Sequence, residues 1–192
     1  MIDGQPIKVH SPRDAINHGI YLVPEDRRKT GLITSMAVRE NVTLAALSRY
    51  SRLGLISFRR ESETAEAQRK KLSIKTATCE TLAKNLSGGN QQKVVLAKWL
   101  SLNPKLIIFD EPTRGVDVGS KAEIYRLMRG LADEGVFILM ISSDMEEVLG
   151  VSDRIAVMRE GALTGLLEAK DFSEEAVMRL AVAPVRTAET LV

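Results

Sequence analysis

The feature that most constrains the fold of this 192-residue sequence is a set of four short apolar runs. The runs are continuously apolar and do not alternate with polar residues, which is typical of strands covered on both faces of a sheet. They occupy residues 19–23, 106–109, 136–141 and 154–158. Helical patterns at residues 120–133 and 144–149 separate the last three runs. This alternation of strand and helix predicts an α/β fold with a mainly parallel sheet.

The stretch from about residue 34 to residue 86 departs from that rhythm. It carries helical periodicity through Val38 and Val42, then a charged segment at residues 59–71, and no strong strand candidate. The charged segment mixes both signs, which favours a solvated helix face over a binding patch. We therefore predict an inserted helical subdomain. The resulting division assigns residues 1–33 and 87–183 to the α/β core, residues 34–86 to the helical subdomain, and residues 184–192 to a flexible tail.

The net charge, the cysteine count and the length of the apolar runs limit the kinds of partner that the chain can have. The 27 Lys and Arg residues nearly balance the 25 Asp and Glu residues, and a net charge of +2 gives no case for nucleic-acid binding. Cys79 is the only cysteine, so neither an intrachain disulfide nor a metal–thiolate cluster can form, which fits a reducing compartment. No apolar run approaches the length needed to cross a bilayer, so a role at a membrane would be that of a peripheral subunit.

The most informative part of the sequence is the segment 86–93, which reads Leu-Ser-Gly-Gly-Asn-Gln-Gln-Lys. Ser87 is a favourable helix N-cap, and Gly88 and Gly89 allow the backbone to approach a ligand closely. An amphipathic helical pattern follows at residues 91–100. The free N–H groups and the positive end of the helix dipole at such a turn suit a phosphate group. Taken alone, a turn of this kind is more often a structural cap than a binding site.

Two carboxylates, Asp110 and Glu111, stand directly after the apolar run at residues 106–109. Open α/β sheets bind their ligands at the carboxyl ends of their strands. An aspartate there can hold Mg²⁺, usually through water, and the neighbouring glutamate can orient or deprotonate an attacking water. The alternative is an aspartate that only caps the next turn. For this pair alone, both readings stay open.

Together the two segments resemble the ATP-binding cassette family, in which a Leu-Ser-Gly-Gly signature precedes a Walker B strand that ends in Asp-Glu. The resemblance covers nearly the whole chain, and residues 115–117 stand at the family's D-loop position. Residues 19–28, 85–93 and 110–119 are similar to the second cassette of bacterial monosaccharide importers of the ribose, galactose, xylose and autoinducer-2 type. Those importers carry two fused cassettes, and this chain is similar to the C-terminal half. The implied fold is a partial P-loop NTPase core.

The resemblance implies an ATP-binding subunit that couples ATP hydrolysis to sugar import. Its implied cofactors are ATP and Mg²⁺. Its implied partners are a second cassette, transmembrane permease subunits and, indirectly, a periplasmic sugar-binding protein, with no nucleic acid. The implied location is the cytoplasmic face of the bacterial inner membrane, as a peripheral subunit. The helical subdomain and the loop around residues 25–31 are the expected docking surface.

The resemblance also implies roles for individual residues. Glu111 is the expected catalytic residue, and Asp110 is the expected Mg²⁺ ligand. Glu25 stands at the Q-loop position, where most cassettes place a glutamine, and is a second candidate metal ligand. Asp117 stands in the D-loop, and Ser143 stands where the family places its switch histidine. The signature residues expected to bind the nucleotide of the partner cassette are Ser87, Gly88, Gly89 and Gln91.

A third departure from the family pattern bears on activity. No Gly-x-x-x-x-Gly-Lys-Ser/Thr sequence occurs, and the nearest imitation, at residues 115–121, lacks the required order. The resemblance places that phosphate-binding loop ahead of Met1, so we expect a chain truncated before it that does not bind ATP tightly by itself. The only histidines, His10 and His18, lie too far upstream to serve as the switch residue and are expected at the surface or in turns.

The sequence leaves three functional readings. In the first, the chain is half of an asymmetric ATPase pair, and its signature completes the ATP site of its partner. In the second, it is a non-catalytic interaction module that docks on a partner cassette. The third is a soluble cassette protein of translation or DNA repair, which would favour long basic linkers or coiled-coil inserts, and the sequence contains neither. We expect the chain to be inactive as an ATPase by itself.

Overall fold

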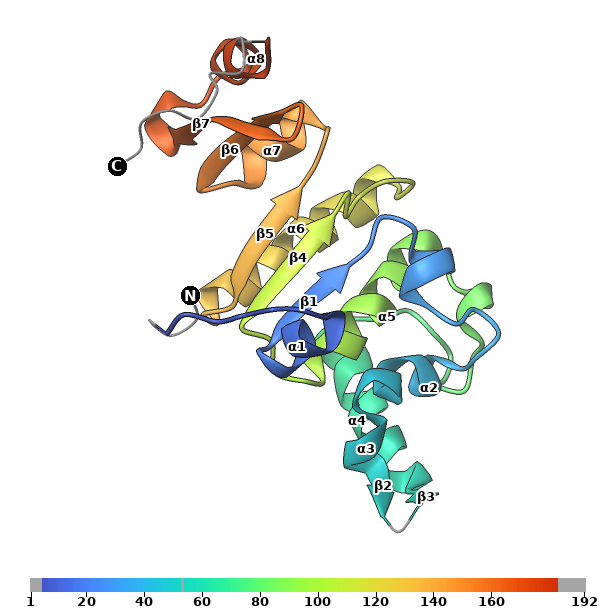
Figure 1. Cartoon of the computed structure of the whole chain (residues 1–192). Coiled ribbons are helices and arrows are strands. Elements are labelled where there is room, and N and C mark those ends of the chain that lie inside the picture. The colour runs from blue at the N-terminus through green and yellow to red at the C-terminus, as the bar shows by residue number, and fades with distance from the viewer. Residues whose placement is uncertain (1–4, 53, 183–192) are drawn as a thin grey trace. The chain divides into compact units, whose positions relative to one another are not determined.

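The computed structural model of the chain describes residues 5–52 and 54–182, so the tail predicted at residues 184–192 lies outside the described part (Figure 1). The chain forms two compact units, Met1–Ile141 and Ser142–Val192. Among the described helices, none combines the length and the apolar character that a bilayer crossing requires.

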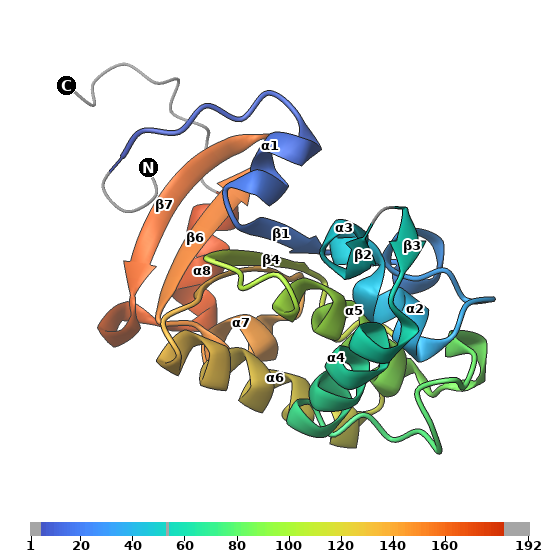
Figure 2. The same ribbon diagram turned by 90° about the horizontal axis from the view of Figure 1, so that it is seen from below.

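A three-stranded parallel sheet lies at the centre of the first unit (Figure 1; Figure 2, from below). Its strands, in spatial order, are β1 (Ile20–Val23), β4 (Leu106–Asp110) and β5 (Phe137–Ile141). Tyr21 pairs with Ile107 across β1 and β4, and all three strands run in the same direction. Their carboxyl ends therefore meet at one edge of the sheet. The parallel sheet and these three strands confirm the sequence prediction.

Two long helices, α5 (Gly88–Leu100) and α6 (Val118–Asp133), pack against one face of this sheet. Because successive side chains of a strand point to opposite faces, every second residue of the sheet meets these helices. The side chains buried in the shared core include Val23, Ile107, Phe109, Val94, Val95 and Ile124. Burial of this apolar surface is the main force that holds the sheet and helices together.

The opposite face of the sheet carries exposed apolar side chains. Leu22 is 46% exposed, Phe137 75% and Leu139 49%. The expectation that the apolar runs are covered on both faces was therefore wrong for β5, where every second residue is exposed. A continuous apolar run indicates that both faces can be covered, but it does not identify a segment that covers them.

Two short helical segments flank β1. The helix α1 (Pro12–Asn17) precedes the strand and begins after Ser11, whose side chain accepts a hydrogen bond from the N–H of Asp14. A single turn of π-helix, η1 (Arg27–Gly31), follows the strand. Both segments place polar residues near the ends of β1.

The region predicted as a helical subdomain is largely helical. Its helices are α2 (Val38–Thr43), η2 (Leu44–Ala46), α3 (Leu47–Tyr50), α4 (Phe58–Lys71) and η3 (Ala83–Asn85). A small antiparallel hairpin of β2 (Ser51–Arg52) and β3 (Leu55–Ile56) joins α3 to α4. The sequence analysis missed this hairpin because strands of two residues leave no detectable pattern. The boundaries predicted near residues 34 and 86 stay predictions.

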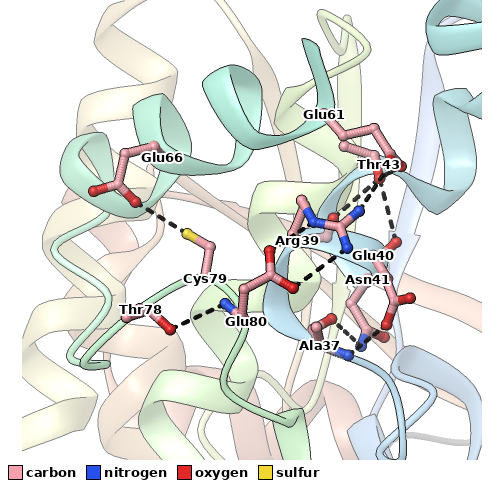
Figure 3. A network of polar contacts seen from close by, with 10 residues as sticks. All are labelled: Ala37, Arg39, Glu40, Asn41, Thr43, Glu61, Glu66, Thr78, Cys79 and Glu80. Atoms are coloured by element: carbon pink, nitrogen blue, oxygen red, sulfur yellow. Dashed lines mark hydrogen bonds and ion pairs between the residues drawn. The ribbon is translucent and has the colours of Figure 1, made fainter. Parts of the chain in front are cut away.

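A buried polar network connects the helices of this region (Figure 3). Arg39 of α2 forms ion pairs of 2.8 Å with Glu61 of α4 and with Glu80. The hydroxyl of Thr43 donates a 2.6 Å hydrogen bond to the second carboxylate oxygen of Glu61. Arg39 and Glu61 are 7% and 3% exposed, so their charges are largely removed from water and depend on each other.

The second unit contains an antiparallel hairpin between helices. Its elements are α7 (Met145–Val151), β6 (Arg154–Arg159), β7 (Ala162–Glu168), η4 (Ala169–Asp171) and α8 (Glu174–Val182). The strand predicted at residues 154–158 is present, but its predicted place in the parallel sheet was wrong, because β6 pairs antiparallel with β7. Glu160 and Gly161 join the two strands with φ angles of 50° and 79°. Two successive positive φ angles form the tight turn that closes a hairpin.

Candidate functional site

The loop after β1 forms the first part of the candidate site. Asp26 caps η1 by accepting hydrogen bonds of 3.1 Å from the backbone N–H groups of Arg28 and Lys29. These bonds, with that from Lys29 foremost, hold the pKa of Asp26 below its ordinary value because they favour the charged carboxylate. The cap fixes the backbone from which Arg27 and Arg28 project.

The predicted signature forms the first turn of α5. Ser87 is the N-cap, and its hydroxyl oxygen accepts hydrogen bonds from Nδ2 and from the backbone N–H of Asn90, at 2.9 and 3.5 Å. Gly88 and Gly89 are the first two residues of the helix. This is the cap that the sequence predicts, with the N-terminal N–H groups of a 13-residue helix at its end.

The two signature glycines are closely packed within this chain. A Cβ atom on Gly88 would lie 2.6 Å from Nη2 of Arg27, so a side chain there would displace the guanidinium. A Cβ atom on Gly89 would lie 2.8 Å from both Cβ and Oγ of Ser120, close to the start of α6, where no flexible group can yield. The glycines therefore have a packing role in addition to any contact with a ligand.

Gln91 is fully buried, although the resemblance assigns it to nucleotide binding. Its Nε2 donates to the carbonyl of Ala83 at 3.0 Å, and its Oε1 accepts from Nε of Arg28 at 3.2 Å. Both ends of the amide thus have protein partners. Contact with a nucleotide stays a prediction, and the observed bonds give Gln91 a role in holding η1 and η3 to α5.

Asp110 and Glu111 lie where β4 ends. Asp110 is the last residue of the strand and pairs with Ile141 of β5. Glu111 has a φ angle of 45°, in the left-handed region that residues with side chains rarely adopt. Its N–H donates to the carbonyl of Ile141 at 2.9 Å, and its carbonyl accepts from the N–H of Arg114 at 3.1 Å. A strained backbone held by its surroundings is typical of functional sites.

Arginine side chains connect the loop after β1 to the loop after β4. Arg27 donates hydrogen bonds from Nη1 to the carbonyl of Arg114 and from Nη2 to that of Gly115, at 3.1 and 3.3 Å. The side chain of Arg114 in turn forms an ion pair with Glu25. The carboxylate of Glu25 thus has a cationic protein partner, and its role as a metal ligand stays a prediction.

Asp117, at the predicted D-loop position, caps α6. Its carboxylate accepts hydrogen bonds from the N–H and the hydroxyl of Ser120, at 3.0 and 2.8 Å. Both bonds, the hydroxyl foremost, hold the pKa of Asp117 below its ordinary value. Ser120 is also the residue against which Gly89 packs. The predicted D-loop and the predicted signature are therefore neighbours.

Ser143, at the predicted switch position, belongs to the second unit. It stands between Ser142, whose hydroxyl is hydrogen-bonded to Glu147, and Asp144, which caps α7 by accepting from the N–H of Glu147 at 3.2 Å. His10 is exposed, and His18 lies in the turn after α1, as the sequence predicts for both.

The carboxylates of the first unit could supply only part of the ligand set of a Mg²⁺ ion. Among residues 5–52 and 54–182, no group of three or more His, Cys, Asp or Glu side chains is arranged to hold a metal ion. Mg²⁺ at phosphoryl-transfer sites is bound by one or two carboxylates together with phosphate oxygens and water. Asp110 and Glu111 at the end of β4 match that smaller donor set, in which the nucleotide supplies the remaining ligands.

Arg27 and Arg28 are the candidate site residues that sequence reasoning missed. The available signal was a pair of adjacent arginines shortly after an apolar strand. That signal is weak, because arginines are common at exposed positions. Their partners, the carbonyls after β4 and the amide of Gln91, are more than sixty positions away in the sequence and cannot be deduced from spacing.

A family model described as ABC transporter matches residues 1–114 of the chain. The arabinose import ATP-binding protein AraG of Vibrio parahaemolyticus is 50% identical over 182 residues, which cover 94% of this chain and 36% of that protein. The ribose import ATP-binding protein RbsA of Bacillus subtilis is 48% identical over 180 residues, which also cover 94% and 36%. The chain thus spans about a third of the length of these relatives.

Solved structures share the fold. A dimeric, post-hydrolysis state of the ATP-binding cassette MJ0796, bound to ADP and Pi, has a TM-score of 0.69 at 23% identity and covers 85% of this chain and 69% of its own. The structure of cbiO1 from Clostridium perfringens, part of the ABC transporter complex cbiONQ, has a TM-score of 0.72 at 25% identity, with 93% and 69% covered. These similarities confirm the predicted α/β class. The family model, the close relatives and the common fold agree that the chain belongs to the ABC transporter family.

Proposed function

We propose that this chain is part of the ATP-binding subunit of a sugar importer, in which ATP hydrolysis drives transport across the bacterial inner membrane. The observation that carries the proposal is the convergence of the signature turn, the acidic end of β4 and the capped start of α6. Contacts of Arg27 and Ser120 hold these segments together. The similarity to relatives named for arabinose and ribose import supports a monosaccharide as the cargo.

In the proposed mechanism the signature acts on the nucleotide of a partner cassette. The first turn of α5 presents backbone N–H groups and the positive end of the helix dipole, and both stabilise phosphate charge. Ser87 adds a hydroxyl group at this turn. Because Gly88 and Gly89 lack side chains, a phosphate can come close to the backbone. Such fixed donors would stabilise the charge on the γ-phosphate during transfer.

Asp110 and Glu111 would serve the half-site of this chain itself. Mg²⁺, when bound with the nucleotide, supplies neutralisation of phosphate charge, and Asp110 would contribute a carboxylate to hold it. Glu111 would orient the attacking water and accept its proton. Its fixed backbone keeps the carboxylate at the edge of the sheet. Because the sequence has Ser143 and not a histidine at the expected switch position, we infer that this half-site is the weaker of the two.

The proposed partners are a second cassette, permease subunits in the membrane and, through these, a periplasmic sugar-binding protein. The subunit would lie peripherally at the cytoplasmic face of the membrane. The helical region of residues 34–86 and the loop at residues 25–31 would contact the permease.

The test is transport by the complete protein that contains this chain. We would reconstitute it with its permease and sugar-binding protein in proteoliposomes and measure ATP hydrolysis and uptake of labelled ribose, arabinose, galactose and xylose. We expect hydrolysis that one sugar-loaded binding protein stimulates, and uptake that requires ATP. Hydrolysis without uptake of any of these sugars would contradict a role in import of this class. Absence of both activities, with retained binding to a partner cassette, would favour the non-catalytic docking module.

A further inference from the structure

The side chain of Arg27 occupies a central position in the candidate site. It projects from the first residue of η1 and forms a fork across the loop after β4, with Nη1 on the carbonyl of Arg114 and Nη2 on that of Gly115. A guanidinium is planar and rigid, so its two hydrogen bonds fix both the distance and the orientation of the loop after β4 relative to η1. Gly115 has a φ angle of 65°, and its carbonyl direction depends on that conformation.

The same guanidinium lies against the signature. The point where a Cβ of Gly88 would stand is 2.6 Å from Nη2 of Arg27 and 3.3 Å from the carbonyl oxygen of Gly115. Arg27, Gly88 and Gly115 therefore meet at one point. A displacement of the loop after β4 cannot leave the first turn of α5 unaffected, because the guanidinium fills the space between them.

Arg28 extends this connection along α5. Its Nε donates to Gln91, and Gln91 donates to Ala83, so η1 holds the signature helix at a second position one turn further on. Burial lowers the pKa of Arg27 below its ordinary value, and within the described residues its buried Nε has no hydrogen-bond partner. Burying a polar N–H group without a partner costs free energy, and the two bonds to the carbonyls after β4 hold Arg27 in place against that cost.

We propose that Arg27 is a positioning residue that couples the two nucleotide half-sites served by this chain. The inference rests on the proposed function. The loop after β4 carries Glu111 and belongs to the chain's own half-site, whereas the signature belongs to the half-site of the partner cassette. Arg27 is the physical link between them, and it sets the signature turn in the geometry that the partner's γ-phosphate requires. A misplacement of about 1 Å can reduce a rate by about a hundredfold.

The first measurement is steady-state ATP hydrolysis by the complete protein with its permease, for Arg27→Ala and Arg27→Lys. We expect kcat of Arg27→Ala to fall at least about tenfold, while KM for ATP changes less than about twofold, because the contact acts on the transition state. Lysine can reach one carbonyl but cannot form the fork, so Arg27→Lys should recover only part of kcat. The matched control is Arg126→Ala, which removes a 3.2 Å guanidinium–carbonyl bond to Ala122 within α6, outside the region proposed to contact the permease.

The second measurement is amide hydrogen exchange of the same proteins without nucleotide. Loss of Arg27 should raise exchange in residues 113–117 and in residues 87–91 together, and Arg126→Ala should leave both segments as in wild type. A rise in only one segment, or in neither, overturns the link. A rise in both with kcat at the wild-type level overturns the coupling role and leaves a purely structural contact. If wild-type protein hydrolyses no ATP, the proposed function fails, and the hydrolysis of the wild type therefore separates that failure from failure of the link.

Discussion

Arg39 and Glu61 form a 2.8 Å ion pair between α2 and α4 in which both side chains are buried. Removing one partner of such a pair leaves an uncompensated charge in the interior, at a cost of about 3–5 kcal/mol. We therefore expect Arg39→Met to lower the free energy of unfolding by about that amount. Urea denaturation followed by circular dichroism measures it. The double variant Arg39→Met/Glu61→Leu should recover most of the loss, because no unpaired charge is left inside.

A surface ion pair supplies the control for that experiment. Arg59 and Glu63 lie 2.9 Å apart on the exposed side of α4. Arg59→Met should leave the unfolding midpoint unchanged, because exposed pairs gain little in water. If Arg39→Met were as well tolerated as Arg59→Met, the network in Figure 3 would not be what holds α2 to α4.

Gly89→Ala should destabilise the protein and impair ATP hydrolysis. The new Cβ would press on Ser120, 2.8 Å away, and overpacking of this kind costs about 1–3 kcal/mol. Gly130→Ala is the matched control, since no atom of another segment lies within 4 Å of a Cβ there and alanine is favoured in the helix α6. The Tm should fall for Gly89→Ala and rise slightly for Gly130→Ala. Ser120→Gly should relieve part of the Gly89→Ala defect, and a defect that Ser120→Gly leaves unaltered would count against the packing explanation.

Substitutions in the signature and at the acidic end of β4 should reduce the rate of ATP hydrolysis by different amounts. Ser87→Arg replaces the helix cap with a bulky cation at the turn that we propose faces the phosphate, and we expect hydrolysis by the complete transporter to fall below about 1% of wild type. Glu111→Gln keeps the shape and the same backbone strain, so it tests only the carboxylate. We expect it to cost less than about tenfold, because the proposed function makes that half-site the weaker of the two. Glu175→Gln, at an exposed position in the first turn of α8, is a surface control. Equal losses for Ser87→Arg and Glu111→Gln would rule out the asymmetry.

Glu66 should make stability depend on pH in the acid range. A hydrogen bond from Arg69, followed by one from Cys79, lowers the pKa of Glu66 to about 2. A carboxyl group whose pKa is depressed on folding stabilises the native state above its unfolded pKa and loses that contribution as the pH falls toward the folded value. Wild type should therefore exceed Glu66→Gln in Tm at pH 6, and the difference should shrink between about pH 4.5 and pH 2. In an Arg69→Gln background most of that difference should be gone at pH 6 as well.

Local patterns were enough to predict the elements that carry the candidate site. The apolar run of β4 followed by Asp110 and Glu111, and the cap at Ser87 followed by an amphipathic helix, are signals that lie within a few residues of each other. Strand, cap and helix are set by such neighbours, and the structure places them as predicted.

Relations between distant segments were not predictable in the same way. The partner of β6 depends on a turn at Glu160 and Gly161 that only one glycine marks in the sequence, so a parallel neighbour was expected where the structure has a hairpin. The bonds of Arg27 join residues that are 87 and 88 positions apart. Hydrogen-bonding capacity is visible in the sequence, whereas the choice of partner is made by the fold.

The close packing of Gly88 and Gly89 bears on how this motif would change during evolution. Selection for a stable fold favours glycine at position 89, because a larger residue would press on Ser120. A lineage that gave up ATP turnover would lose the hydroxyl of Ser87 and the carboxylate of Glu111 long before it lost that glycine. In such lineages glycine at position 89 would indicate that the chain still folds, whereas the serine and the glutamate would indicate that ATP is still hydrolysed.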